Sequence, residues 1–198
     1  MKSTSIRRLG PAFALAAALL GGRTAAAQVF TPTFMGPASS GDVGVYVSDA
    51  GPGTAIEGIW RQRSRSYDIG LRGGFVDAGD GALSLGVEVR NPLHLQTEPV
   101  ALAFTAGAQA LVGDGSALGF QAGLSAGHTF VPGTFTLSPY LHPRIAVARS
   151  LKGGDGFDAD VLADLGVDFG FQPNLSLRLN VGLADSSPDW GIGLAFRR

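Results

Sequence analysis

The chain has 198 residues, no cysteine, 15 basic and 16 acidic residues, and a formal net charge of −1. The lack of cysteine excludes a fold held by disulfides, and the charge balance excludes the basic stripe of a nucleic-acid-binding domain. The 30 glycines are dispersed at alternate positions, which excludes collagen and flexible-linker architectures.

The N-terminus has the features of a secretory signal peptide. A basic start precedes an apolar run from Ala12 to Leu20, which is too short for a spanning helix, and Ala25-Ala26-Ala27 supplies small residues for cleavage. We predict that residues 1–27 are removed by cleavage after Ala27. Loss of this leader leaves eleven basic and sixteen acidic residues, a net charge of −5.

Residues 28–40 are rich in proline, serine and glycine, and we predict an irregular lead-in there. From residue 41 to residue 198, apolar side chains alternate with polar or small ones, most clearly after Asp158. Because successive side chains of a strand point to opposite faces, this period of two predicts an all-β domain. The predicted strands are 42–48, 54–62, 67–76, 83–90, 100–111, 118–130, 135–148, 160–171, 175–184 and 190–197.

Ten strands is an even number, although eight also fits the pattern. Most of them have about 9–13 residues, which suits a tilted strand that crosses a bilayer, whereas strands of soluble proteins average about 5–6 residues. The seventh segment contains Pro139 and Pro143, which cannot donate to a ladder, so we predict a bulge or bend there.

The alternation allows two assignments of the faces. In a transmembrane barrel the apolar face meets lipid and the polar face lines the lumen, whereas a soluble exported β-barrel that binds an apolar ligand inside has them exchanged. The two predict opposite positions for Leu177 and Arg178. Strand length favours the membrane, and so do aromatic residues near predicted strand ends, as in interfacial girdles: Trp60, Tyr67, Phe75, Phe130, Phe135, Phe169, Phe171, Trp190 and Phe196.

The leader, the alternating segments and a last strand with Trp190, Ile192, Leu194 and Phe196 resemble the small bacterial outer-membrane β-barrel family, of the OmpA and opacity type. The resemblance implies a closed antiparallel up-and-down transmembrane barrel in the outer membrane, in contact with its lipid and, we expect, monomeric. In that family a C-terminal aromatic residue is recognised by the barrel-assembly machinery, which implies this role for Phe196. Here two arginines follow it.

The predicted inward face carries nearly balanced charges. Buried charges persist when they are paired, and a barrel of about ten strands is near the size that side chains can fill. We therefore predict a plugged or very narrow lumen with a structural or narrow passive, porin-like channel role. The predicted lumen-lining residues are Glu57, Arg61, Asp68, Arg72, Glu88, Arg90, Arg144, Asp160, Asp164, Asp168 and Arg178.

Asp160, Asp164 and Asp168 offer oxygen ligands, but residues four apart on one strand lie about 13 Å apart. They cannot share one cation, and we expect them to pair with Arg144 and Arg178 instead. No metal site is predicted.

A barrel enzyme is a third hypothesis, and its best centre is His142, which the alternation places inward. It would need an acid or a serine within hydrogen-bond reach of the imidazole. We expect a structural role for His142, and no catalytic residue or cofactor is predicted.

Overall fold

The computed structural model describes residues 31–38, 41–49, 53–77, 79–93, 100–113, 116–153, 156–183 and 190–197. The predicted leader and its cleavage site lie outside these residues. Within the described ranges no helix is long and apolar enough to cross a membrane. The strands are β1 (Asp42–Asp49), β2 (Thr54–Ser64), β3 (Tyr67–Val76), β4 (Ala82–Leu93), β5 (Ala101–Gly113), β6 (Ala117–Gly127), β7 (Thr136–Ser150), β8 (Asp158–Gln172), β9 (Leu175–Gly182) and β10 (Trp190–Arg197).

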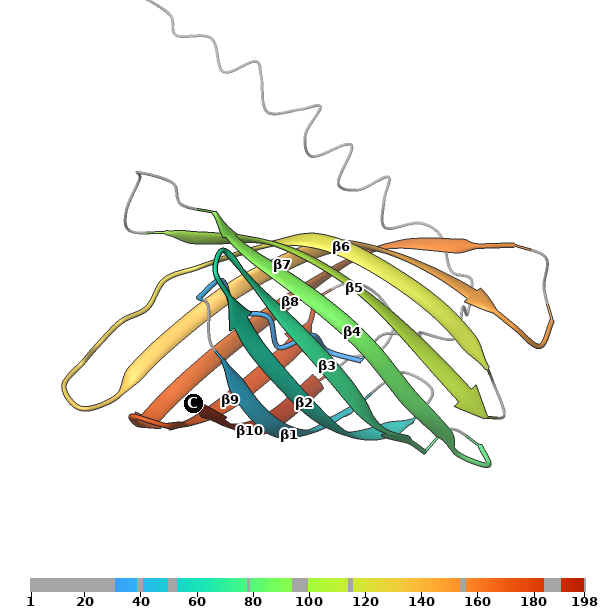
Figure 1. Cartoon of the computed structure of the whole chain (residues 1–198), viewed down its shortest axis with the longest axis horizontal. Helices are drawn as coiled ribbons and strands as arrows, with labels where there is room; N and C mark the ends of the chain where they lie inside the picture. Colours follow the sequence, from blue (N-terminus) through green and yellow to red (C-terminus); the bar gives the residue numbers. More distant parts are fainter. Residues whose placement is uncertain are drawn as a thin grey trace, which may run out of the picture.

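Each strand pairs antiparallel with the next one in the sequence, and β10 returns to pair with β1 (Figure 1). At this seam Val45 lies opposite Leu194, and Val43 lies opposite Phe196. Closure satisfies the backbone groups that an open sheet would leave at its edges. The prediction of a closed, antiparallel, up-and-down barrel of about ten strands is confirmed.

The apolar face of the wall points outward, and the polar face points inward. In β3, Ile69 and Leu71 are exposed, whereas Asp68 and Arg72 on either side of them are buried. In β9, Arg178 is buried inside the barrel and Leu177 lies on the outer face. The assignment with exchanged faces, and with it an apolar ligand cavity inside, is therefore wrong.

Of the bulge or bend predicted in the seventh strand, the bulge is wrong. β7 keeps one register with β8 from Thr136 to Ala148, and the register shift of the sheet falls between Gly170 and Gln172, where β8 pairs β9. The prolines instead affect the pairing of β7 with its other neighbour, β6. His128 N donates to Pro139 O at 3.2 Å, and a proline nitrogen cannot return the bond.

The same argument applies to Pro143, which has the same orientation four residues later. The β6–β7 ladder is interrupted at this point, between the pair Gly123–Arg144 and the pair Ala126–Leu141. The chain therefore accommodates both prolines by losing donors to β6, while β7 keeps its register with β8.

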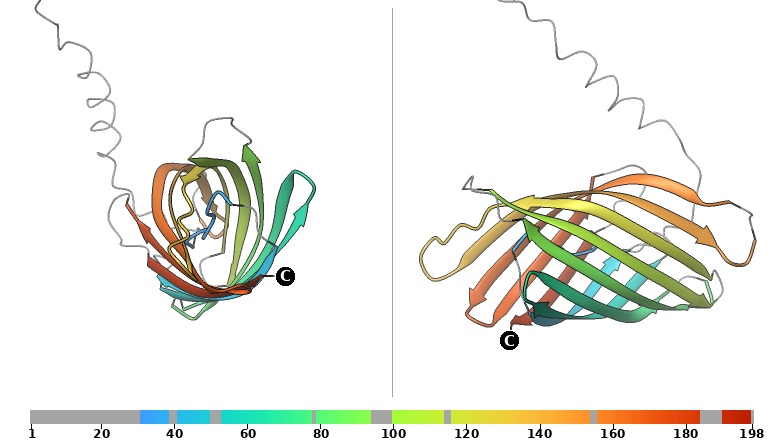
Figure 2. Two further views of the ribbon diagram at one scale, coloured as in Figure 1. Left: turned by 90° about the vertical axis from the view of Figure 1, so that its left-hand side faces the viewer. Right: turned by 45° about the horizontal axis from the view of Figure 1, so that its top comes forward.

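The barrel has two distinct ends. We call the end where β1 begins and β10 finishes the termini end, and the opposite end the loop end. Residues 31–37, hereafter the N-terminal segment, form no strand and lie buried inside the ring of strands, where Figure 2 shows them in blue in the view into the barrel. The interior thus contains a stretch of the chain's own backbone as well as side chains of the wall.

Candidate functional site

Most of the predicted lumen residues lie inside the barrel. Nine of the eleven are buried: Glu57, Arg61, Asp68, Arg72, Glu88, Arg90, Arg144, Asp164 and Arg178. Asp168 is half-buried and points to the same interior.

Asp160 is the exception, because it is exposed. Its position on the alternating face is as predicted, but β8 extends beyond the last pair that it forms with β9, between Asp164 and Gly182. Without a neighbouring strand on that side, the face that would line the lumen opens to the surroundings. The prediction that Asp160 lines the lumen is wrong.

Three ion pairs link β2, β3 and β4 on one side of the lumen, two of them between adjacent strands and one from β2 to β4. Arg72 Nη2 lies 2.5 Å from Glu57 Oε2, and Arg61 Nε lies 2.5 Å from Glu88 Oε1. The third pair, Arg90 Nη2 to Asp68 Oδ2, has a distance of 2.6 Å. These side chains come from β2, β3 and β4, so the charges compensate one another where water is largely excluded.

A second cluster lies at the β10–β1 seam and on β7 to β9. Arg178 Nη2 contacts Asp42 Oδ2 at 2.7 Å, its Nε lies 3.2 Å from Asp168 Oδ2, and its Nη1 donates to the Tyr46 hydroxyl at 2.9 Å. Arg144 Nη1 pairs with Asp164 Oδ2 at 2.5 Å. Asp164 and Asp168 thus contact the arginines expected from the sequence.

Asp42 is a lumen residue that the sequence analysis missed. Its side chain is fully buried, between the guanidinium groups of Arg178 and Arg61, the latter at 3.5 Å. The signal was present, since Asp42 precedes the outward Val43 and so falls on the inward face. It lies at the first position of a strand, where an aspartate also suits a turn.

The N-terminal segment occupies the lumen beside these charges. Arg72 Nη2 donates to Thr31 Oγ1 and to Pro32 O, the latter at 3.2 Å. Arg61 Nη2 donates to Thr33 O at 2.9 Å. Nearer the termini end, Arg90 Nη1 donates to Gly36 O at 2.7 Å.

The ring of Phe34 fills a slot in the wall at the barrel seam. Its centroid lies 4.4 Å from that of Tyr46, and both rings are packed with Ile59 and Ala195. A Cβ atom added to Gly191 of β10 would lie 2.4 Å from Phe34 Cζ, so only a glycine leaves room for this ring. The slot is therefore shaped by a strand glycine.

His142 bridges the N-terminal segment and the wall. Its Nδ1 is 2.9 Å from Thr33 Oγ1, and its Nε2 is 2.7 Å from Thr105 Oγ1. The carboxylate of Asp164 is 3.7 Å from Nδ1 and is already paired with Arg144. Both ring nitrogens of this buried imidazole are occupied by threonine hydroxyls, which is the arrangement of a structural histidine.

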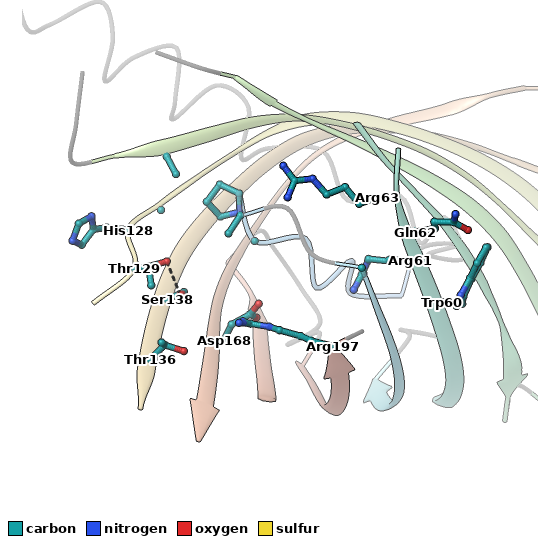
Figure 3. Close-up of a pocket in the computed structure, with 16 residues that line it drawn as sticks. Trp60, Arg61, Gln62, Arg63, His128, Thr129, Thr136, Ser138, Asp168 and Arg197 are labelled. Atoms are coloured by element: carbon teal, nitrogen blue, oxygen red, sulfur yellow. Dashed lines mark hydrogen bonds between the residues drawn. The ribbon is translucent and has the colours of Figure 1, made fainter. Parts of the chain in front are cut away.

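A cavity of about 710 Å³ opens at the termini end, and we call it the vestibule. Arg63 and Arg197 line it (Figure 3), and so do Gly36 and Pro37 of the N-terminal segment. Thr129 and Ser138 hydrogen-bond to each other at its side, 2.8 Å apart. The N-terminal segment thus separates the vestibule from the deeper lumen.

The interior near the loop end is lined by apolar side chains. Inward residues of five strands form one buried group, the apolar cluster: Ala55, Val76, Leu111, Ala117 and Ala146. Along the axis the interior therefore changes from a polar vestibule to a charged middle with the N-terminal segment, and then to the apolar cluster.

The part of the chain that the structure describes contains no group of three histidine, cysteine or acidic side chains that could hold a metal ion. The acidic residues of the lumen instead face arginines.

Comparisons with known proteins provide no family assignment. No protein-family model matches the chain, and no curated protein matches it. Among solved structures it is similar to a bacterial polysaccharide outer membrane secretin, with a TM-score of 0.45 and 9% identity over 79% of this chain. The chain spans 57% of that secretin, less than two thirds of its length.

It is also similar to the KdgM porin in complex with disordered oligogalacturonate, with a TM-score of 0.45 and 10% identity over 80% of this chain and 98% of the porin. The KdgM porin alone gives a TM-score of 0.42 and 7% identity over 78% of this chain and 98% of the porin. At these values the narrower resemblance to OmpA and opacity barrels stays a hypothesis, and the function must be derived from the residues of this chain.

Proposed function

We propose that the protein is an integral outer-membrane β-barrel with a structural or narrow passive-channel role, closed in the described state. The observation that carries this proposal is the inverted polarity of the wall. Apolar side chains cover the outside, among them Val45, Leu71, Val87, Ile145 and Leu194, each at least 47% exposed. A soluble monomer rarely exposes an apolar patch larger than a few hundred Å², whereas lipid requires such a surface.

The position of the aromatic side chains supports a membrane interface. Tyr67, Phe130, Phe171 and Phe196 are exposed on the outer surface near the termini end, and Phe75 and Trp190 are exposed near the loop end. Aromatic rings prefer the boundary between hydrocarbon and water. The apolar wall between the two sets is the surface that outer-membrane lipid would cover.

The predicted leader provides export, and we place the termini end in the periplasm. Short connections at this end, between β2 and β3 and between β8 and β9, suit the periplasmic side of such barrels. Phe196 would then present an exposed ring at the periplasmic end of the last strand, where the barrel-assembly machinery could recognise it. We propose a monomer, since closure uses every strand of one chain.

A channel role is supported by the polar interior. Some buried polar atoms of the lumen, namely Gln109 Oε1, Gln121 Oε1 and Ser125 Oγ, have no hydrogen-bond partner among the described residues. Buried polar groups are normally satisfied by protein or water, so a hydrated lumen would satisfy these atoms. A catalytic role is not proposed, because the buried His142 offers no free nitrogen to a substrate.

Heat-modifiability tests the membrane barrel. The mature chain, residues 28–198, is refolded in detergent, and boiled and unboiled samples are compared by gel mobility and circular dichroism. We expect a mobility shift on boiling, with sheet structure that forms only with detergent or lipid. A chain that folds as a soluble monomer in plain buffer would contradict the proposal. If the mobility shift is seen, conductance in planar bilayers distinguishes a channel from a structural barrel.

A further inference from the structure

The N-terminal segment is held in the lumen as a bound peptide is held in a binding site. Three backbone carbonyls, those of Pro32, Thr33 and Gly36, each accept a hydrogen bond from a buried arginine of the wall. The segment contributes no strand to the sheet, and all ten strands close the barrel without it. Its position therefore depends on side-chain recognition by the wall.

We propose that the charged middle of the lumen is a binding site for an uncharged peptide, and that its resident ligand is the chain's own N-terminal segment. This inference rests on the proposed barrel and deepens it. The ligand is a segment with the pattern Thr-x-Thr-Phe-x-Gly. While it is bound, it blocks the path from the vestibule to the deeper lumen.

Side chains of the segment supply the specificity. The hydroxyl of Thr33 binds His142, and the ring of Phe34 fills the slot over Gly191. A Cβ atom at Gly36 would approach Tyr140 Cδ1 to 3.3 Å, so a larger residue at this position would press on that ring. These contacts select a pattern, whereas the arginine bonds to carbonyls accept any sequence.

The backbone of the segment is shaped by the site. Phe34 has a φ angle of 50°, in the left-handed region that non-glycine residues rarely adopt. Such a conformation persists where the surroundings determine it. Here the surroundings are the Tyr46 ring on one side and the carbonyl contacts of Arg61 and Arg72 on the other.

The site keeps its charge balance when the segment leaves. The arginines that bind carbonyls also pair with carboxylates of the wall: Arg61 with Glu88, Arg72 with Glu57, and Arg90 with Asp68. Removing the segment therefore uncovers hydrogen-bond donors without leaving an isolated buried charge. An empty site of this kind can be refilled by a peptide added from outside.

Peptide binding in trans tests the inference. Residues 31–37 of the mature chain are replaced by a Gly/Ser run of equal length, and folding is checked by heat-modifiability. A fluorescent peptide Thr-Pro-Thr-Phe-Met-Gly-Pro is then titrated, and binding is followed by anisotropy. We expect saturable binding to this variant and at least about tenfold weaker binding to the intact chain, whose site is occupied.

A peptide with alanine in place of the phenylalanine is the matched control, and it should bind about tenfold more weakly, as expected for loss of a filled slot. A heat-modifiable Gly/Ser variant that binds neither peptide, or both equally, would overturn the peptide site and leave the membrane barrel intact. If the intact chain itself never becomes heat-modifiable, the proposed barrel is contradicted and the peptide site is removed with it.

A second measurement keeps the segment in place and uses the absence of cysteine from the chain. Met35→Cys puts a single thiol at a position that is 2% exposed, and Ala38→Cys puts one at an exposed position next to the segment. A maleimide reagent should label Met35→Cys much more slowly than Ala38→Cys. Adding Gly191→Leu, which fills the Phe34 slot, should raise the labelling rate of Met35→Cys about tenfold and leave Ala38→Cys unchanged.

Phe34→Ala provides the same test without altering a strand, and it should also raise the labelling rate of Met35→Cys. Equal labelling of the two thiols in the intact chain would mean that the segment is not held in the lumen. No change in rate with either added substitution would mean that the slot does not hold it. Either result overturns the proposed site.

Discussion

The two faces of one barrel wall impose different demands on the sequence. On the outer face of β3, Ile69 and Leu71 contribute hydrophobicity, and another large apolar residue would serve equally well. On the inner face of the same strand, Asp68 and Arg72 each contact a particular partner, Arg90 and Glu57. The outside is specified by composition and the inside by pairing, so equal changes on the two faces should have unequal effects.

The largest effect is expected where one arginine neutralises two acids. Arg178→Leu leaves the buried Asp42 and the half-buried Asp168 without their shared partner, which should lower the free energy of unfolding by about 3–5 kcal/mol. Arg178→Lys keeps the charge but not the planar geometry, and should lose less. Urea unfolding in lipid vesicles measures both. Equal stability of Arg178→Leu and the original chain would show that pairing does not specify the inner face.

A charge on the outer face gives the next largest effect. Leu165 lies near the middle of β8 with 47% of its surface exposed. In lipid, Leu165→Arg should cost about 2–4 kcal/mol, whereas Leu165→Ala should cost much less. For a soluble barrel the same exposed position would tolerate arginine with almost no loss. The unfolding free energy of this pair of variants therefore also tests the solvent of the outer face.

Two aspartates of β8 sharpen the comparison within a single strand. Asp164→Asn removes a carboxylate that lies 2.5 Å from Arg144, and we expect a loss of about 1.5–3 kcal/mol, the usual value of a hydrogen bond to a charged group. Asp160→Asn, at an exposed position with the same alternation, should leave stability unchanged. If both substitutions reduced the unfolding free energy equally, Asp160 would line the lumen after all.

These contrasts show how much the sequence could predict. Period-two alternation determines strands and faces, so the ten strands and the inward positions of Arg72, Arg144 and Arg178 followed from local pattern alone. The exposure of Asp160 could not be predicted, because it arises where β8 extends past the last residue that pairs with β9. That position is set by the pairing register of the two strands, which the local pattern does not give. Alternation predicts which face a residue occupies, but not whether a neighbouring strand covers it.

The N-terminal segment shows a second limit. Its proline-rich composition predicts irregular structure and nothing about burial. Its place in the lumen depends on the ring of Phe34 fitting against Gly191, a residue far away in the sequence that has no side chain to obstruct it. Glycines recur throughout the strands, so no local signal marks this one as part of a slot. Long-range complementarity of shape had to come from the three-dimensional structure.

The smallest effect is expected at Pro143, where the outer face carries a backbone defect. Pro143→Val keeps an apolar, exposed side chain and restores an N–H directed at β6, where the ladder is interrupted. A hydrogen bond adds about 0.5–1.5 kcal/mol, and the loss of proline's restriction on the unfolded chain offsets about 0.4–1 kcal/mol of this. We therefore expect a net gain of about 0.5 kcal/mol.

Amide hydrogen exchange of the Pro143→Val variant measures the new bond directly, because the added N–H should be protected as strongly as its neighbours in β7. An amide that exchanges as fast as those in exposed turns would mean that β6 and β7 are separated there for another reason. The ladder would then be interrupted independently of the prolines, and the prolines would be tolerated there because no hydrogen bond is lost. Since an apolar side chain is retained, any change reports on the backbone of the wall and not on its outer surface.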